Sequence, residues 1–173
     1  ICTLLLLSIV TCVFFVHVMG KWAANTIYIR ADGSMDPEGA PITTHDNITY
    51  TLTDNITSSA DGIIVERDNI VIDGDGYVVV GAGYPFKGID LSNRINVTVK
   101  NVTIRNFYTG IYLKYSNQIT LVSNSIEENV LDGIQLSYSL NNNITANNVT
   151  ENEYGGIRLF YSSNNNTING NTV

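Results

Sequence analysis

Cysteine is almost missing from this chain of 173 residues, and both copies, Cys2 and Cys12, lie in its first twenty residues. The rest of the chain therefore contains no disulfide and no thiolate metal site. Histidine is equally scarce, since His45 is the only one beyond residue 20. A copper or zinc site needs three or four suitable ligands in a fixed geometry, so we expect no such site and no cofactor.

Charge is also low. Only 14% of the residues are charged, against about 25% in typical globular domains. Lys and Arg number 9 against 16 Asp and Glu, which gives a net charge of −7. We expect no nucleic-acid partner, because phosphate binding needs clustered basic residues. Asparagine supplies the polarity instead, with 18 copies in residues 93–173.

The first twenty residues have no charged side chain, and Lys21 carries the first charge. The apolar run from Leu4 to Val16 has the length of a signal-peptide core or of a membrane span. We expect residues 1–24 to be a cleaved signal peptide, with a retained helical anchor as the alternative. The protein is then secreted, periplasmic or on the cell surface, and touches a membrane only through residues 1–20. Because the sequence begins with Ile and ends part-way through a repeat, we expect it to be a fragment.

A repeat fills the second half of the chain. Gly-Ile-x-Leu begins at Gly88, Gly110, Gly133 and Gly156, and the first interval is one position shorter than the other two. Two further short stretches of alternating apolar residues follow within each repeat. Alternation over three or four residues is typical of strands with one side chain inward and the next outward.

Three short strands in about 23 residues fit one turn of a solenoid, in which equivalent residues of successive coils stack about 4.8 Å apart. We predict an all-β fold, a right-handed single-stranded parallel β-helix with about 22–23 residues per coil, over residues 62–173. Residues 25–61 lack the repeat and contain Pro37 and Pro41. An open solenoid end exposes strand edges, so we assign 25–61 to an N-terminal β cap.

Asparagines keep the same phase as the glycines. Counted back from each Gly, Asn106, Asn129 and Asn152 stand four positions before it, and Asn101, Asn124 and Asn147 stand nine before it. Asparagine tolerates left-handed backbone at tight corners, and its amide can bond to an asparagine in the next coil. We predict two columns of stacked amides.

The run from Asp61 to Tyr77 (Asp-Gly-Ile-Ile-Val-Glu-Arg-Asp-Asn-Ile-Val-Ile-Asp-Gly-Asp-Gly-Tyr), followed by Gly-Ile-x-Leu coils, resembles the NosD-like right-handed β-helix proteins. These are exported proteins of bacteria and archaea, grouped also with carbohydrate-binding and sugar-hydrolase β-helix domains. The resemblance spans residues 26–173 and implies the fold. The asparagine-rich style and the opening Thr26-Ile-Tyr-Ile-Arg-Ala-Asp-Gly look archaeal. The founding NosD proteins assist copper-site maturation in nitrous oxide reductase, so the resemblance also implies an accessory role as an alternative.

Outward-facing positions supply the candidate ligand contacts. The residue between Ile and Leu is Asp90, Tyr112, Gln135 or Arg158 in successive coils, and Tyr115, Tyr138 and Tyr161 recur at the next corner. Aromatic, amide and charged side chains repeating along a flat face suit a polysaccharide. The tyrosines fit equally well as packing that covers the edge of the coils.

Asp73 and Asp75 form the one close carboxylate pair of the coils, in Asp-Gly-Asp-Gly. We interpret them as a turn, with a weak calcium site as an alternative and a catalytic pair as a more remote one. We assign no catalytic residue. Among the Asn-x-Thr sequons, Asn47 and Asn55 are the best glycosylation candidates. Asn101 is expected to be inaccessible in its column.

The sequence thus favours an exported surface protein, non-catalytic, that binds polysaccharide or another cell-envelope partner along its outer faces. One alternative is a polysaccharide lyase or hydrolase whose catalytic coils lie outside these residues. The other is a NosD-like accessory factor in copper-enzyme maturation.

Overall fold

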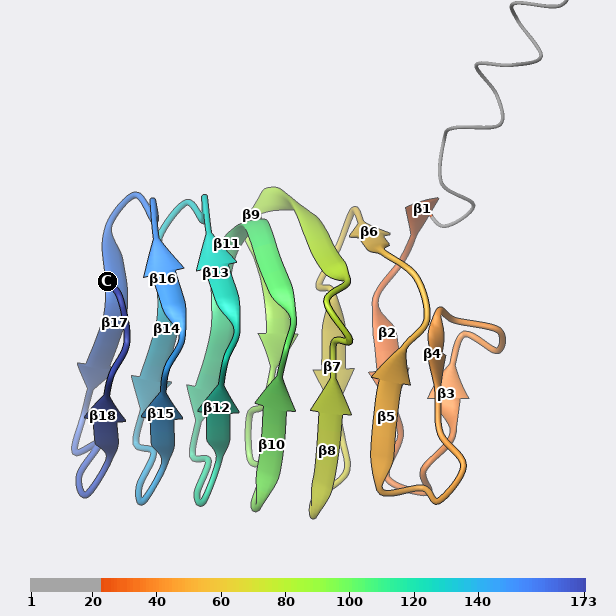
Figure 1. Cartoon of the computed structure of the whole chain (residues 1–173), viewed down its shortest axis with the longest axis horizontal. Coiled ribbons are helices and arrows are strands. Elements are labelled where there is room, and N and C mark those ends of the chain that lie inside the picture. Colours follow the sequence, from red (N-terminus) through yellow and green to blue (C-terminus); the bar gives the residue numbers. More distant parts are fainter. Residues whose placement is uncertain (1–22) are drawn as a thin grey trace, which may run out of the picture.

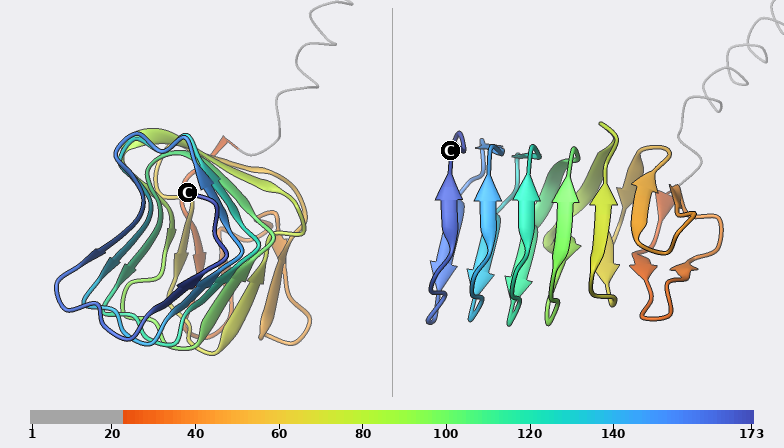
Figure 2. Two further views of the ribbon diagram at one scale, coloured as in Figure 1. Left: turned by 60° about the vertical axis from the view of Figure 1, so that its left-hand side comes forward. Right: turned by 60° about the horizontal axis from the view of Figure 1, so that its bottom comes forward.

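The computed structural model describes residues 23–173, which form a parallel β-helix of stacked coils (Figure 1). The described residues contain 18 strands and no helix, so the predicted all-β solenoid is confirmed. Successive coils follow nearly the same outline when viewed toward the end of the rod (Figure 2). The predicted signal or anchor segment falls on residues 1–24 and lies almost entirely outside the described part.

Each coil except the last, which has only β17 and β18, contributes a strand to each of three faces. The first face consists of β2 (Ile27–Ile29), β7 (Ile63–Val65), the second halves of β9 (Val78–Asp90) and β11 (Thr103–Lys114), β14 (Asp132–Ser137) and β17 (Gly155–Phe160). The second face is a seven-stranded sheet of β4 (Ile42–Thr43), β5 (Thr49–Leu52), β8 (Ile70–Asp73), β10 (Val97–Lys100), β12 (Thr120–Val122), β15 (Asn143–Thr145) and β18 (Thr167–Asn169).

The third face consists of β1 (Ala23–Ala24), β6 (Ile56–Ser58), the first halves of β9 and β11, β13 (Ser125–Glu127) and β16 (Asn148–Thr150). Because β9 and β11 continue from the third face into the first, these two faces form one eleven-stranded sheet, which also includes β3 (Met35–Asp36).

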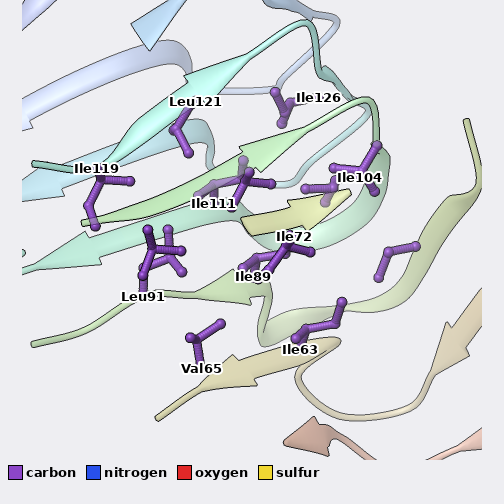
Figure 3. Packing of buried hydrophobic residues seen from close by; sticks show 14 of the residues in the cluster. Ile63, Val65, Ile72, Ile89, Leu91, Ile104, Ile111, Ile119, Leu121 and Ile126 are labelled. Carbon is purple, nitrogen blue, oxygen red and sulfur yellow. The ribbon is translucent and has the colours of Figure 1, made fainter. Parts of the chain in front are cut away.

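A column of six isoleucines runs through the core behind the first face. Strand pairing places them in one register, in the order Ile27, Ile63, Ile89, Ile111, Ile134 and Ile157. The first five have no exposed surface. Figure 3 shows Ile63, Ile89 and Ile111 among the other buried aliphatic side chains. The Gly-Ile-x-Leu repeat thus produces a continuous dry core in which each β-branched side chain packs on its equivalents.

The segment 25–61, predicted as a cap, contains strands of two kinds. β2, β5 and β6 pair in parallel with β7, β8 and β9, and so form one more coil. β3 and β4 instead pair antiparallel with β2 and β5. These two short strands occupy the outer edges of the sheets, where unpaired backbone groups would otherwise be offered to another chain.

Asparagine ladders close the corners of the later coils. Nδ2 of Asn124 donates to Oδ1 of Asn147 at 2.9 Å, and Nδ2 of Asn147 donates to Oδ1 of Asn171 at 3.0 Å. The same oxygens accept the backbone N–H groups of Asn124 and Asn147. Comparable ladders join Asn129 to Asn152 and Asn142 to Asn166. Each amide therefore satisfies buried backbone groups in two coils at once.

The predicted columns were wrong at Asn101 and Asn106, which lie one position outside the ladders. Arg105 pairs with Glu127, whereas Thr109 pairs with Asp132, so the offset between paired residues grows by one along β11. The position that the shorter coil lacks therefore lies between Arg105 and Thr109. Asn101 and Asn106 were located by counting back from Gly110, and this count passes the missing position, so it is wrong by one residue. Val102 and Phe107 occupy the ladder positions, and their N–H groups donate to Asn124 and Asn129.

Asn101 and Asn106 have positive φ values of 55° and 60°, so both supply left-handed backbone at the corners. Asn101 is exposed, contrary to the prediction that it would be inaccessible. Its Nδ2 donates to Oδ1 of Asp73 at 3.2 Å.

Candidate functional site

The first face carries the predicted outward residues in one row. Strand pairing aligns Asp90 with Tyr112, Tyr112 with Gln135, and Gln135 with Arg158. A second row, three residues earlier along each strand, consists of Lys87, Thr109 and Asp132, and the last two are buried. We call these seven residues the outer strip. Within each row, residues of successive coils lie on adjacent parallel strands, about 4.8 Å apart.

An ion pair lies at the N-terminal end of the outer strip. Nζ of Lys87 lies 2.6 Å from Oδ2 of Asp90 and 4.6 Å from the centre of the Tyr112 ring. Oδ1 of Asp90 accepts hydrogen bonds from the backbone N–H and the hydroxyl of Ser92. Asp90 is only 9% exposed, so it is the least accessible of the four predicted contact residues.

A second ion pair lies at the C-terminal end. Nη1 of Arg158 donates to Oδ1 of Asp132 in the preceding coil at 2.9 Å. The guanidinium carbon of Arg158 lies 4.4 Å from the ring centres of both Tyr154 and Phe160. These cation–π contacts and the carboxylate fix the guanidinium on the strip.

Asp132 is fully buried, and its Oδ2 has no hydrogen-bond partner among the described residues. Burial raises the pKa of the Asp132 carboxyl above the ordinary aspartate value, and Arg158 offsets only part of that effect. Sequence reasoning missed this residue, because it considered the position between Ile and Leu and passed over the position before Gly. Lys87 and Thr109 were missed for the same reason.

The centre of the strip is uncharged. Tyr112 and Gln135 are half-buried and adjacent across β11 and β14, and Thr109 lies buried beside them. A phenol hydroxyl and a carboxamide both donate and accept hydrogen bonds. The two half-exposed side chains at the centre are therefore suited to hydroxyl groups.

The three corner tyrosines form a stacked ladder beside the strip. The ring centres of Tyr115 and Tyr138 lie 5.0 Å apart with an interplanar angle of 16°, and those of Tyr138 and Tyr161 lie 5.1 Å apart at 11°. All three have positive φ, a strained conformation for a bulky side chain. Because the rings face one another, the ladder presents ring edges and hydroxyl groups rather than open aromatic faces. Lys114 lies over the Tyr115 ring at 5.6 Å.

Asp73 and Asp75 lie at the end of β8 on the second face, away from the outer strip. Oδ2 of Asp73 lies 2.8 Å from Nζ of Lys100, while Oδ1 accepts from the N–H of Asp75 and from Asn101. Burial opposes ionisation of Asp73, but these contacts outweigh it and hold its pKa below the usual range. Asp75 is exposed in left-handed backbone, as a turn residue would be.

Asn47 and Asn55, the predicted glycosylation candidates, are both exposed near the N-terminal end of the coils. Asn47 has a φ of 54°, and Oδ1 of Asn55 accepts the N–H of Val78 at 2.9 Å. Neither residue contributes to the outer strip.

Within residues 23–173, no three His, Cys, Asp or Glu side chains lie close enough together to hold a metal ion. The same stretch includes no helix with the length and apolar character of a membrane span.

Comparison with known proteins supports the fold. A family model described as a right handed beta helix region matches residues 38–173, in agreement with the predicted handedness. Among solved structures, the A-module of the mannuronan C-5 epimerase AlgE4 from Azotobacter vinelandii is similar, with a TM-score of 0.46 and 14% identity. The match covers 69% of this chain and 53% of that module. A search of curated proteins finds no match.

Proposed function

Because the chain belongs to the right-handed β-helix family, we propose that it is an exported, non-catalytic protein that binds a polysaccharide along the outer strip. The observation that carries the proposal is the alignment of Asp90, Tyr112, Gln135 and Arg158 on four adjacent strands of one face. A solenoid face with a polar group in every coil is suited to an extended polymer whose units also repeat.

Two further features support a carbohydrate rather than a protein partner. The accessible centre of the strip consists of Tyr112 and Gln135, whose hydroxyl and carboxamide groups can bond to sugar hydroxyls. A stable protein interface normally buries an apolar centre, whereas the partly exposed residues of the outer strip, Lys87, Tyr112, Gln135 and Arg158, all carry polar groups. Export is supported by the apolar run between Leu4 and Val16 and by the resemblance to NosD-like proteins.

The alternative of catalysis on the same polymer is less well supported by the strip. The carboxylates of Asp90 and Asp132 are each held in an ion pair, and Asp132 is fully buried. A general acid or base must reach the proton that it transfers, either directly or through one water molecule. We therefore keep the proposal to binding.

The test is retention of the protein in native gels that contain soluble extracellular polysaccharides. A double variant, Tyr112→Phe with Gln135→Leu, removes the two central polar groups while keeping side-chain size. We expect it to lose at least tenfold in affinity for any polymer that retards the parent protein, which is about 1.4 kcal/mol.

A matched control changes two outward threonines on the second face, Thr98→Val and Thr120→Val, which are paired with each other across β10 and β12. The control should be retarded like the parent. Equal loss of affinity in both double variants, or no loss in the first, contradicts the proposal.

A further inference from the structure

We infer that the polysaccharide bound by the outer strip is a neutral one, an inference that rests on the proposed binding function and adds the charge class of the ligand. The charged side chains of the strip already pair with one another. Lys87 and Arg158 supply its positive charges and Asp90 and Asp132 its negative ones.

Each cation of the strip is neutralised by a carboxylate of the strip. The nitrogen–oxygen distances are 2.6 Å for Lys87 and Asp90 and 2.9 Å for Arg158 and Asp132. Side-chain exposure of the two carboxylates is only 12% and 0%, while Lys87 and Arg158 are 30% and 27% exposed, so the carboxylate of each pair is the part that is shielded from water. Charge-assisted hydrogen bonds of this length are among the stronger polar contacts in proteins.

A polyanion would have to replace these contacts. Withdrawing Arg158 from Asp132 would leave a fully buried carboxylate without a partner, which is costly. The protein as a whole carries a net charge of −7, which further disfavours a polyanion. Asp90 is already paired, and the unpartnered Oδ2 of Asp132 is buried, so neither carboxylate is open to a polycation.

The groups left for a ligand are therefore neutral. Tyr112 and Gln135 lie between the two ion pairs, and both are partly exposed. A polymer whose units carry only hydroxyl groups can bond to them without disturbing either pair. An ion pair with a shielded carboxylate that is left intact also discriminates against charged competitors at no cost to the neutral ligand.

The experiment compares affinities of the protein for a neutral panel (dextran, mannan, arabinogalactan and a soluble β-glucan) and a charged panel (polygalacturonate, dextran sulfate and diethylaminoethyl-dextran). We expect at least one neutral polymer to bind tenfold or more tightly than each charged polymer, with affinity that changes less than twofold between low and high salt. Binding to charged polymers alone overturns the inference and leaves the proposed function standing. Binding to no member of either panel overturns the proposed function and the inference with it.

A double variant tests directly whether the two ion pairs cause the preference for a neutral polymer. Asp90→Asn with Asp132→Asn removes both strip carboxylates while keeping side-chain size and an acceptor oxygen, and so frees Lys87 and Arg158. We expect it to gain at least tenfold in affinity for polygalacturonate, and this gain should disappear at high salt.

The matched control frees two cations on other faces. Asp73→Asn releases Lys100 on the second face, and Glu128→Gln releases Arg105 on the third. This double variant changes the net charge by the same amount and should gain less than threefold. An equal gain in the control, or no gain in the strip variant, overturns the inference.

Discussion

The side-chain amide of Asn124 donates to the carboxamide oxygen of Asn147, one coil further on, at 2.9 Å. Both side chains are 2% exposed, so this contact lies inside the rod. Oδ1 of Asn147 accepts the backbone N–H of Asn124 as well, and Nδ2 of Asn147 donates to the carbonyl of Leu121. One side chain thereby satisfies polar groups of two neighbouring coils.

Replacing this side chain should destabilise the fold strongly. Asn147→Ala leaves the N–H of Asn124 and the carbonyl of Leu121 buried without their partner, at about 1–3 kcal/mol for each unsatisfied group. We expect the free energy of unfolding in urea to fall by about 3 kcal/mol. Asn164→Ala, at an exposed corner, is the control and should change it by less than about 0.5 kcal/mol. Similar losses in both variants would contradict the role given to the ladder.

The tyrosine ladder should contribute to stability rather than to binding. Tyr138 stacks on Tyr115 and on Tyr161, and the double-mutant cycle of Tyr115→Ala and Tyr138→Ala should give a coupling energy of about 1 kcal/mol. Because the rings cover one another's faces, Tyr138→Ala should change the affinity for polysaccharide less than twofold. A coupling energy near zero together with a tenfold loss of affinity would assign the ladder to the ligand instead.

Asp132 and Asp73, whose pKa values are shifted in opposite directions, should affect stability with opposite dependence on pH. The pKa of Asp132 is raised in the folded state, so the unfolded chain releases this proton first as the pH rises. The contribution of Asp132 to stability is therefore greatest below the unfolded pKa and is lost as the pH rises through the folded pKa. Asp132→Asn should gain in stability relative to the parent as the pH rises above about 4, the ordinary aspartate value.

Asp73 serves as the opposite case. Its pKa is lowered in the folded state, so its contribution is present above the unfolded pKa and is lost as the pH falls through the folded pKa. Asp73→Asn should therefore lose stability relative to the parent at neutral pH and approach it in acid. Urea midpoints measured from about pH 3 to pH 7 provide the check, and differences of the same sign for both variants would contradict the assignments.

The fold could be predicted from the sequence because its strongest constraint is periodic. Each coil needs inward Ile and Leu at fixed positions, and a shift by one residue would turn them outward. Four coils therefore show the same motif. Ile27 could not be aligned with them, since residues 30–48 separate its strand from the next strand of the coil and hold β3 and β4.

The sequence could not show where in the coil from Gly88 to Gly110 the missing position lies. The shorter interval shows only that one position is missing, whereas strand pairing shows that it is missing between Arg105 and Thr109. Phe107 fills a position that carries asparagine in later coils. Its ring packs so closely against Gly81 that a Cβ on Gly81 would lie 2.4 Å from it. Such a substitution has no signature in the spacing alone.

The outer strip was predicted in part. The row from Asp90 to Arg158 follows from alternation within each strand, and strand pairing agrees with it. The ion pair of Arg158 with Asp132 crosses between coils, and the long arginine side chain reaches diagonally into the preceding one. Diagonal contacts of this kind depend on rotamers, which no repeat pattern encodes.

The most direct test of the proposed binding is a crystal structure of the protein with an oligosaccharide taken from the polymer that binds best. We predict that the sugar lies along the first face, with hydroxyl groups within hydrogen-bond distance of Tyr112 and Gln135 and with both ion pairs of the outer strip intact. A sugar bound over the tyrosine ladder or on another face, or one whose charged group displaces Asp132 from Arg158, would contradict it.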